Sequence, residues 1–304
     1  MQNSRIPMYI AITQNVVNII ASLGLVYLCG MKVEGVALGT LIAQYAGFLM
    51  GIVLWMHNYG RLKRFWEIKN YKLKIKGREG AGIWEKEAMF RFFQVNRDIF
   101  LRTLCLVAVT LFFTSAGASQ GEIILAVNTL LMQLFTLFSY VMDGFAYAGE
   151  ALSGRYIGAR NREAFTDTVR HLFGWGAVMA VLFTLVYALG GNAFLGLLTD
   201  DKEVIAVADT YFYWALAVPA VGIAAFIWDG IFIGATATRG MLLSMAAAAV
   251  SFFILYYGLH PVLANHALWL AFLTYLLMRG VVQTGLSREV IRRAFPSKKE
   301  PAWR

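Results

Sequence analysis

The sequence of 304 residues is 59% hydrophobic, and only 15% of its residues are Asp, Glu, Lys or Arg. Soluble domains carry about 25% charged residues, so this composition excludes an ordinary soluble domain and predicts an integral membrane protein. The formal net charge of +9 could suit a nucleic-acid partner, but the positions of the basic residues argue against that class.

Eight uncharged or nearly uncharged stretches are long enough to be transmembrane helices. A helix rises 1.5 Å per residue, so about 20 residues cross a hydrocarbon core of about 30 Å. The stretches are residues 6–29, 36–56, 101–118, 123–149, 172–189, 211–236, 241–259 and 267–286. The uncharged run from Gly240 to Met278 is too long for one crossing, and Gly258, Pro261 and the pair Asn265–His266 are expected to divide it. The predicted fold class is therefore all-α, a polytopic membrane helix bundle.

Lysines and arginines fall almost entirely on one side of this predicted bundle. If both chain ends are cytoplasmic, only Lys32 and Lys202 of the 27 basic residues lie outside. Cytoplasmic loops are enriched in Lys and Arg, so the distribution predicts a plasma-membrane protein with both termini inside. The basic segments are expected to contact membrane lipids, and no nucleic-acid partner is expected.

One long hydrophilic segment follows the first two stretches. Its first part is basic and aromatic and suits anionic headgroups. Its second part places Trp84, Met89, Phe92 and Phe93 on one helix face, which is typical of an interfacial amphipathic helix. A solvated linker explains the same residues equally well.

The hydrophilic segment defines the predicted organisation. The predicted parts are two helices in 1–57, a cytoplasmic linker in 58–96, a six-helix bundle in 97–287 and a cytoplasmic tail in 288–304.

Glycine pairs four residues apart recur along the stretches. Such pairs let helix backbones approach closely in lipid, so close helix packing is predicted. The pairs are Gly35/Gly39, Gly47/Gly51, Gly117/Gly121, Gly154/Gly158 and Gly230/Gly234.

Acidic residues inside the apolar stretches are candidates for function. Asp143 and Asp229 each open a segment that continues with Gly, small residues and an Arg. If both face one cavity, low polarity and mutual repulsion would favour proton uptake. The alternative is that they cap or bridge helices near the inner leaflet. Glu150 and Arg155 are expected at the membrane interface or at a gate.

No catalytic or metal-binding set is evident. Residues 117–121 match the G-x-S-x-G pattern, but that motif needs a preceding strand and a nearby His. His260 and His266 make a poor metal pair, and Cys29 and Cys105 are read as small core residues without a disulfide. The protein is therefore not expected to be an enzyme or to hold a metal or cofactor.

Five segments together resemble the multidrug and toxic compound extrusion (MATE) family, and its DinF-like branch in particular. They are residues 35–45, 96–103, 125–133, 143–161 and 229–239, and they follow the family's order. The resemblance implies a two-lobe transporter that exchanges cationic or amphipathic compounds for H⁺ or Na⁺. It also implies that the chain corresponds to helices five to twelve and lacks helices one to four.

The resemblance implies roles for particular residues. Asp229 matches the tenth-helix acid that some members use for ion coupling, with Asp143 as the second candidate. Asn18 matches the fifth-helix Asn, but Ser22 stands where many members have Asp. An interhelical hydrogen bond is an equally good explanation of Asn18. The residues expected to line the substrate cleft are Asn18, Asn128, Met132, Gln133, Phe135 and Tyr140.

The function expected from the resemblance is secondary active efflux of organic cations by H⁺ or Na⁺ antiport. One alternative is a flippase for a lipid-linked oligosaccharide or similar amphiphile. That cargo would need a cationic cleft, and the arginines are expected to cluster at the cytoplasmic edge. Another alternative is an inactive fragment, for which upstream sequence would supply the missing helices.

Overall fold

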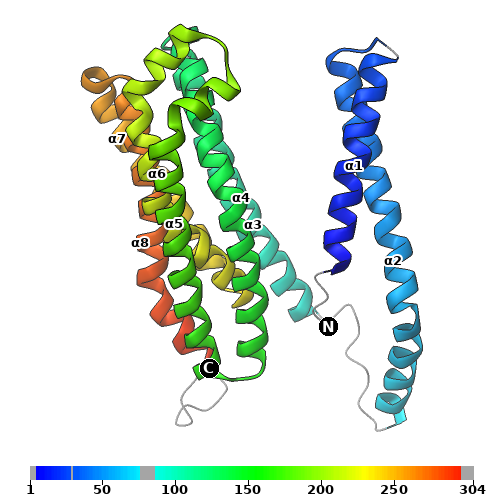
Figure 1. Ribbon diagram of the computed structural model, residues 1–304. Helices are drawn as coiled ribbons and strands as arrows, with labels where there is room; N and C mark the ends of the chain where they lie inside the picture. Colours follow the sequence, from blue (N-terminus) through cyan, green and yellow to red (C-terminus); the bar gives the residue numbers. More distant parts are fainter. Residues whose placement is uncertain (1–4, 29, 76–85, 296–304) are drawn as a thin grey trace. The chain divides into compact units, whose positions relative to one another are not determined.

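The computed structural model describes residues 5–28, 30–75 and 86–295, and these ranges contain eight α-helices and no strand (Figure 1). The helices are α1 (Arg5–Tyr27), α2 (Val33–Ile75), α3 (Lys86–Ala118), α4 (Glu122–Gly158), α5 (Arg162–Leu198), α6 (Lys202–Gly234), α7 (Thr238–Leu263) and α8 (Asn265–Ala294). Each contains one of the predicted stretches almost completely and is long and apolar enough to cross a membrane. The all-α multi-pass fold is therefore confirmed.

Most helices extend beyond the apolar stretches that predict them, and polar residues form some of their ends. The side chain of Asn161 caps α5 by accepting from the Ala164 N–H at 3.0 Å. Asp201 caps α6 by accepting from the Glu203 N–H at 2.9 Å and the Val204 N–H at 3.3 Å. Such caps satisfy amides that have no partner inside the helix.

The division of the long C-terminal run lies slightly later than the glycine and proline suggest. Helix α7 continues through Pro261 to Leu263, and the break occurs at Ala264, whose φ is 46°. A positive φ cannot continue a right-handed helix, so Asn265 begins α8 in a new direction.

The predicted linker 58–96 is mostly helical where the structure describes it. Helix α2 continues to Ile75, and α3 begins at Lys86 and runs without interruption into the apolar stretch. The helix predicted in this part of the linker is therefore continuous with α3 from Lys86 onward, and its interfacial position stays a prediction. Trp84 lies outside the described residues.

The chain forms two compact units, Met1–Lys86 and Glu87–Arg304. In the first unit α1 and α2 pair as a hairpin. A Cβ added to Gly39, Gly47 or Gly51 would meet Ser22, Gln14 or Ile10 of α1, respectively. The positions are eight and then four residues apart on both helices, so the glycines lie on one face of α2 along a continuous α1–α2 contact, as predicted.

The second unit, α3 to α8, is built around α6 and α8. In each of these helices 61% of the apolar span is buried, against 17–33% in α3, α4, α5 and α7. A Cβ at Gly230 or Gly234 of α6 would overlap the carbonyl oxygen of Ala146 or Glu150 of α4. The predicted close packing at this glycine pair is therefore present, and it brings α4 directly against α6.

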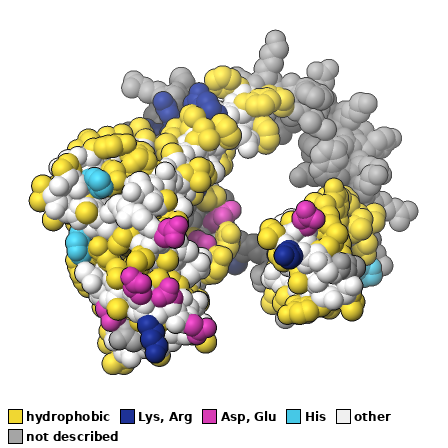
Figure 2. Space-filling model, turned by 90° about the horizontal axis from the view of Figure 1, so that it is seen from above, with side chains coloured by type: hydrophobic (Ala, Val, Ile, Leu, Met, Phe, Trp, Pro, Cys, Tyr) yellow, Lys and Arg dark blue, Asp and Glu magenta, His cyan; other side chains and the backbone are white. Residues whose placement is uncertain are grey.

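Charge differs between the two ends of the six-helix unit. The end seen in Figure 2 carries acidic side chains, and hydrophobic side chains surround it. Glu122, Asp201 and Glu203 are exposed near the helix starts at this end, together with Lys202. The opposite turns, from α4 to α5 and from α6 to α7, are flanked by exposed Arg160 and Arg239.

Candidate functional site

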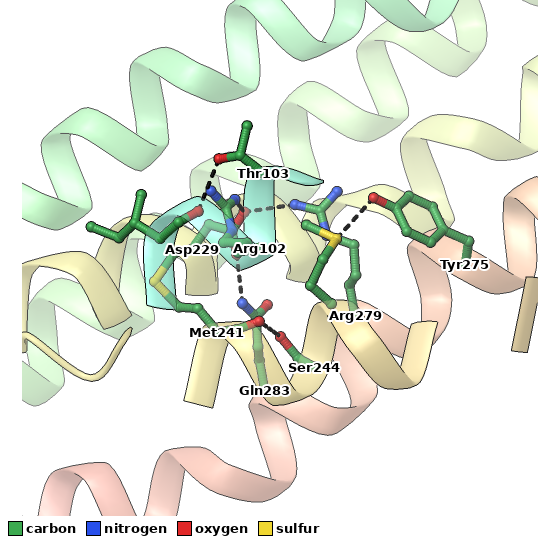
Figure 3. Close-up of polar contacts among 10 residues, drawn as sticks. Arg102, Thr103, Asp229, Met241, Ser244, Tyr275, Arg279 and Gln283 are labelled. Carbon is green, nitrogen blue, oxygen red and sulfur yellow. Dashed lines mark hydrogen bonds and ion pairs between the residues drawn. The ribbon is translucent and has the colours of Figure 1, made fainter. Parts of the chain in front are cut away.

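A buried ionic cluster lies inside the six-helix unit around Asp229 of α6. Its carboxylate Oδ2 accepts from Arg279 Nη2 of α8 at 2.6 Å and also from Arg102 Nη2 of α3. Its Oδ1 accepts from Gln283 Nε2 of α8 at 2.5 Å. We call Arg102, Asp229, Arg279 and Gln283 the Asp229 network; it ties three helices together (Figure 3).

The local sequence explains how these side chains meet. Arg279 and Gln283 are four residues apart, so they lie on the same face of α8. Gly280, next to Arg279, lets α8 approach α6, since a Cβ there would lie 2.8 Å from the Cβ of Ala224. Gly230, next to Asp229, gives the corresponding close approach to α4.

Arg279 is held by aromatic rings as well as by the carboxylate. Its guanidinium lies 5.9 Å from the ring centre of Phe226 and 5.6 Å from that of Tyr275. The residue is 4% exposed. Aromatic faces attract a desolvated cation, so α6 and α8 together supply both a counter-charge and a π-surface for it.

Some buried side-chain atoms of the Asp229 network have no hydrogen-bond partner in the described part of the chain. Among the described residues, Arg102 Nε, Arg279 Nε and Gln283 Oε1 are buried and have no hydrogen-bond partner. The Arg102 side chain is 20% exposed, against 5% for Arg279. Arg102 is therefore the arginine nearer to the outside of the cluster.

Asp143 of α4, the second predicted acid, lies beside this network but outside its hydrogen bonds. It interacts electrostatically with Asp229, Arg279 and Arg102. It is half-buried, and it makes no hydrogen bond or ion pair with another residue of the described chain. The structure thus brings the two predicted acids into one electrostatic environment.

The α4 residues predicted to line the cleft have different surroundings. Gln133 and Tyr140 are exposed, and Met132 and Phe135 are half-buried. The ring of Phe135 lies 5.1 Å from that of Phe272 of α8. Gln133 and Tyr140 are therefore free to contact a solute within this unit, whereas Phe135 packs against the core.

Asn128 is buried, and both its amide nitrogen and its amide oxygen are hydrogen-bonded. It donates to Asn265 Oδ1 at 2.8 Å, and its own Oδ1 accepts from Asn265 Nδ2 at 2.9 Å and from Trp269 Nε1 at 2.8 Å. The side chain joins α4 to α8 in this structure.

The other predicted residues have local contacts within their own units. Asn18 donates to Thr40 Oγ1 at 3.2 Å and accepts from Ser22, which is the interhelical arrangement considered for it. Glu150 is half-buried on α4. The exposed guanidinium of Arg155 lies 5.8 Å from the ring centre of Tyr156.

Sequence reasoning missed the cationic partners of Asp229. The charge pattern counts Arg102 and Arg279 among the basic residues of the cytoplasmic edge, whereas in the structure both are largely buried and pair with Asp229 between the helices. The sequence signal is the pair Arg279 and Gln283, four residues apart within the apolar stretch 267–286.

A cavity of about 560 Å³ lies at the end of the unit that carries the basic turns. Its lining includes Asp98, one turn along α3 from Arg102, together with Thr238 and Leu286. Asp98 is 1% exposed and accepts from Thr238 Oγ1 at 3.3 Å. In the part of the chain that the structure describes, no group of three or more His, Cys, Asp or Glu residues could hold a metal ion.

Comparisons with known proteins agree with this architecture. Residues 99–260 match the family model described as MatE. The "DNA damage-inducible protein F" of Escherichia coli (strain K12) is 38% identical over 283 residues, which cover 92% of this chain and 58% of that protein. The chain therefore spans somewhat more than half the length of this curated relative.

Two solved structures have a similar fold. The crystal structure of MATE in the bent conformation has a TM-score of 0.73 at 17% identity, covering 95% of this chain and 62% of that one. A MOP superfamily transporter from Pyrococcus furiosus has a TM-score of 0.74 at 14% identity, covering 95% and 63%. Because the family model matches more than half of its residues, the chain belongs to the MATE family of membrane transporters.

Proposed function

We propose that this chain takes part in secondary active efflux of organic cations or amphipathic compounds, driven by antiport of H⁺ or Na⁺ across the plasma membrane. The distribution of Lys and Arg supports a cytoplasmic position for both chain ends. The proposal extends from the family to this chain, which covers 58% of its E. coli relative.

The observation that carries the proposal is the Asp229 network beside Asp143. Ionisable groups within membrane helices are expensive unless they face protein or water, and they usually mark ion pathways. Here four such groups, from α3, α4, α6 and α8, interact with one another. A helix bundle that served only as an anchor would not need them.

The proposed mechanism couples a carboxylate to the substrate. Asp229 and Asp143 are the candidates for binding the coupling ion, and exposed Gln133 and Tyr140 of α4 are candidates for substrate contact. One charge moving through about 150 mV supplies about 3.5 kcal/mol. That energy supports a substrate gradient of several hundredfold.

The test is export of ethidium by inverted membrane vesicles containing the chain, with an imposed pH or sodium gradient. The double variant Asp143→Asn/Asp229→Asn should lower the gradient-driven rate by at least about tenfold. Asp209→Asn is the matched control, because Asp209 is an exposed acid on the same helix as Asp229. Unchanged export by the double variant, or none by the unaltered chain, would contradict the proposal.

The structure also favours keeping a second candidate, a flippase for an anionic amphiphile. The sequence argument against it was that arginines stay at the cytoplasmic edge, whereas Arg102 and Arg279 lie inside the bundle. Translocation of a fluorescent lipid pyrophosphate in the same vesicles, lost in Arg102→Gln, would support this candidate over cation export.

A further inference from the structure

Both oxygens of the Asp229 carboxylate are hydrogen-bonded to neighbouring side chains. Oδ2 accepts from two guanidinium groups and Oδ1 from the Gln283 amide. The side chain is only 11% exposed. An ion that bound at Oδ2 would compete with contacts from α3 and α8, and one that bound at Oδ1 would compete with the Gln283 amide of α8.

Protonation of Asp229 would also leave Arg102 and Arg279 without the counter-charge to which they are hydrogen-bonded. Arg279 is buried, and Arg102 is four-fifths buried. Removing one partner of a buried ion pair is strongly destabilising, because the remaining charge stays in a medium of low polarity. Asp229 is therefore suited to remain a fixed anion that holds α3, α6 and α8 together.

Asp143 has the opposite properties. It makes no hydrogen bond or ion pair with any residue of the described ranges, and it is half-buried. Tyr140 and Tyr147, one turn to either side, are each 71% exposed. This face of α4 is thus open within the six-helix unit, and an ion reaching Asp143 would displace no hydrogen bond or ion pair of the described residues.

The charges facing Asp143 come from three neighbouring helices. They are Arg102 of α3, Asp229 of α6 and Arg279 of α8, and half-buried Glu150 lies two turns away on α4 itself. With Asp143 ionised, the two arginines and two aspartates sum to zero. With Asp143 protonated, the same four groups carry one positive charge.

We propose that Asp143 is the carboxyl that takes up and releases the coupling proton, and that Arg102, Asp229 and Arg279 form a permanent positioning network beside it. The proposal rests on the proposed antiport. The positive charge left by protonation of Asp143 repels a cationic solute, and its loss on deprotonation removes the repulsion. Proton and organic cation therefore compete, as exchange requires.

The test uses dicyclohexylcarbodiimide, which forms adducts with protonated carboxyls, on the full chain in membranes, followed by peptide mass spectrometry. The adduct on Asp143 should increase as pH falls from 9 to 6, with Asp229 unmodified, and addition of ethidium should reduce it. Labelling in sodium dodecyl sulfate, where both carboxyls are accessible, is the control for detection. Preferential modification of Asp229, or pH-independent modification of Asp143, would overturn the proposal.

The assignment of Asp143 can be tested separately from the export activity, and the pH dependence of export provides a second measurement. Labelling requires no transport, so a chain that failed to export ethidium could still show which carboxyl takes the proton. If export occurs, the charge-balanced variant Asp229→Asn/Arg102→Gln should retain a pH-dependent rate, whereas Asp143→Asn should lose the pH dependence. A double variant that inserts and folds but exports independently of pH would assign coupling to Asp229 instead.

Discussion

Two clusters of buried polar side chains in the six-helix unit each connect helices that are distant in sequence. The Asp229 network joins α3, α6 and α8 by charge-assisted bonds. The Asn128 cluster joins α4 to α8 through neutral amide and indole groups. The first contains ionisable groups and the second does not, so we propose that ion coupling takes place at Asp143 beside the first cluster and that the second only attaches helices.

Replacing Asn128 by Ala should destabilise the unit. The substitution would leave the Trp269 N–H and the Asn265 amide buried without partners, since both residues are at most 1% exposed. Unsatisfied buried groups of this kind cost about 1–3 kcal/mol. Thermal unfolding of the detergent-purified protein measures the change, with Gln133→Ala, an exposed position on the same helix, as the control. Equal unfolding temperatures for the two variants would refute the structural role.

The sequence identifies one half of the ionic site and misses the other for a physical reason. Asp229 stands out because it interrupts an apolar stretch. Arg102 and Arg279 lie beside segments rich in basic residues, so hydropathy assigns them to the cytoplasmic edge. Only the three-dimensional arrangement shows that their long side chains reach the same carboxylate.

At the scale of elements, the apolar stretches predict how many helices occur but not where they end. Hydropathy identifies only the segment that fits in hydrocarbon. The backbone hydrogen bonds extend further, so α4 ends at Gly158 and α5 begins at Arg162, both outside the predicted apolar stretches. The capping residue Asn161 fixes the start of α5. The glycine pair of α6 correctly predicts a close contact, but spacing alone does not identify α4 as its partner.

The α4–α6 crossing should be sensitive to a single methyl group. A Cβ at Gly230 would overlap the carbonyl of Ala146, a backbone atom that cannot rotate away. Overpacking at such a site costs about 1–3 kcal/mol, and it would also displace neighbouring Asp229. Gly230→Ala should therefore lower the thermal unfolding temperature in detergent.

Gly144→Ala on the facing helix is the matched control for this crossing. A Cβ at Gly144 would have no atom within 4 Å, and alanine is the better helix former. We expect this variant to unfold at the same temperature as the unaltered chain or higher. If Gly230→Ala proved as stable as Gly144→Ala, the close backbone contact would be absent in the membrane.

On the scale of the whole molecule, charge separates the two ends of the helices. The turn that precedes α6 carries Asp200 and Asp201, and the α4–α5 turn carries Arg160. Membrane insertion retains positively charged turns in the cytoplasm. The charges in the sequence thus predict the orientation of the chain in the membrane. The packing of the helices within each unit does not determine that orientation.

This orientation can be measured with single cysteines in a chain whose Cys29 and Cys105 are replaced by Ser. Asp200→Cys should react with a membrane-impermeant maleimide added to intact cells, because its turn is expected outside. Arg160→Cys should react only after the cells are permeabilised, because its turn is expected in the cytoplasm. Both positions are exposed at helix ends, so accessibility to the reagent depends on membrane side and not on burial. If both cysteines reacted from the same side, α5, which lies between them, would not cross the membrane. If only Arg160→Cys reacted from outside, the orientation would be the opposite of the predicted one, and the proposed export would run in the opposite direction.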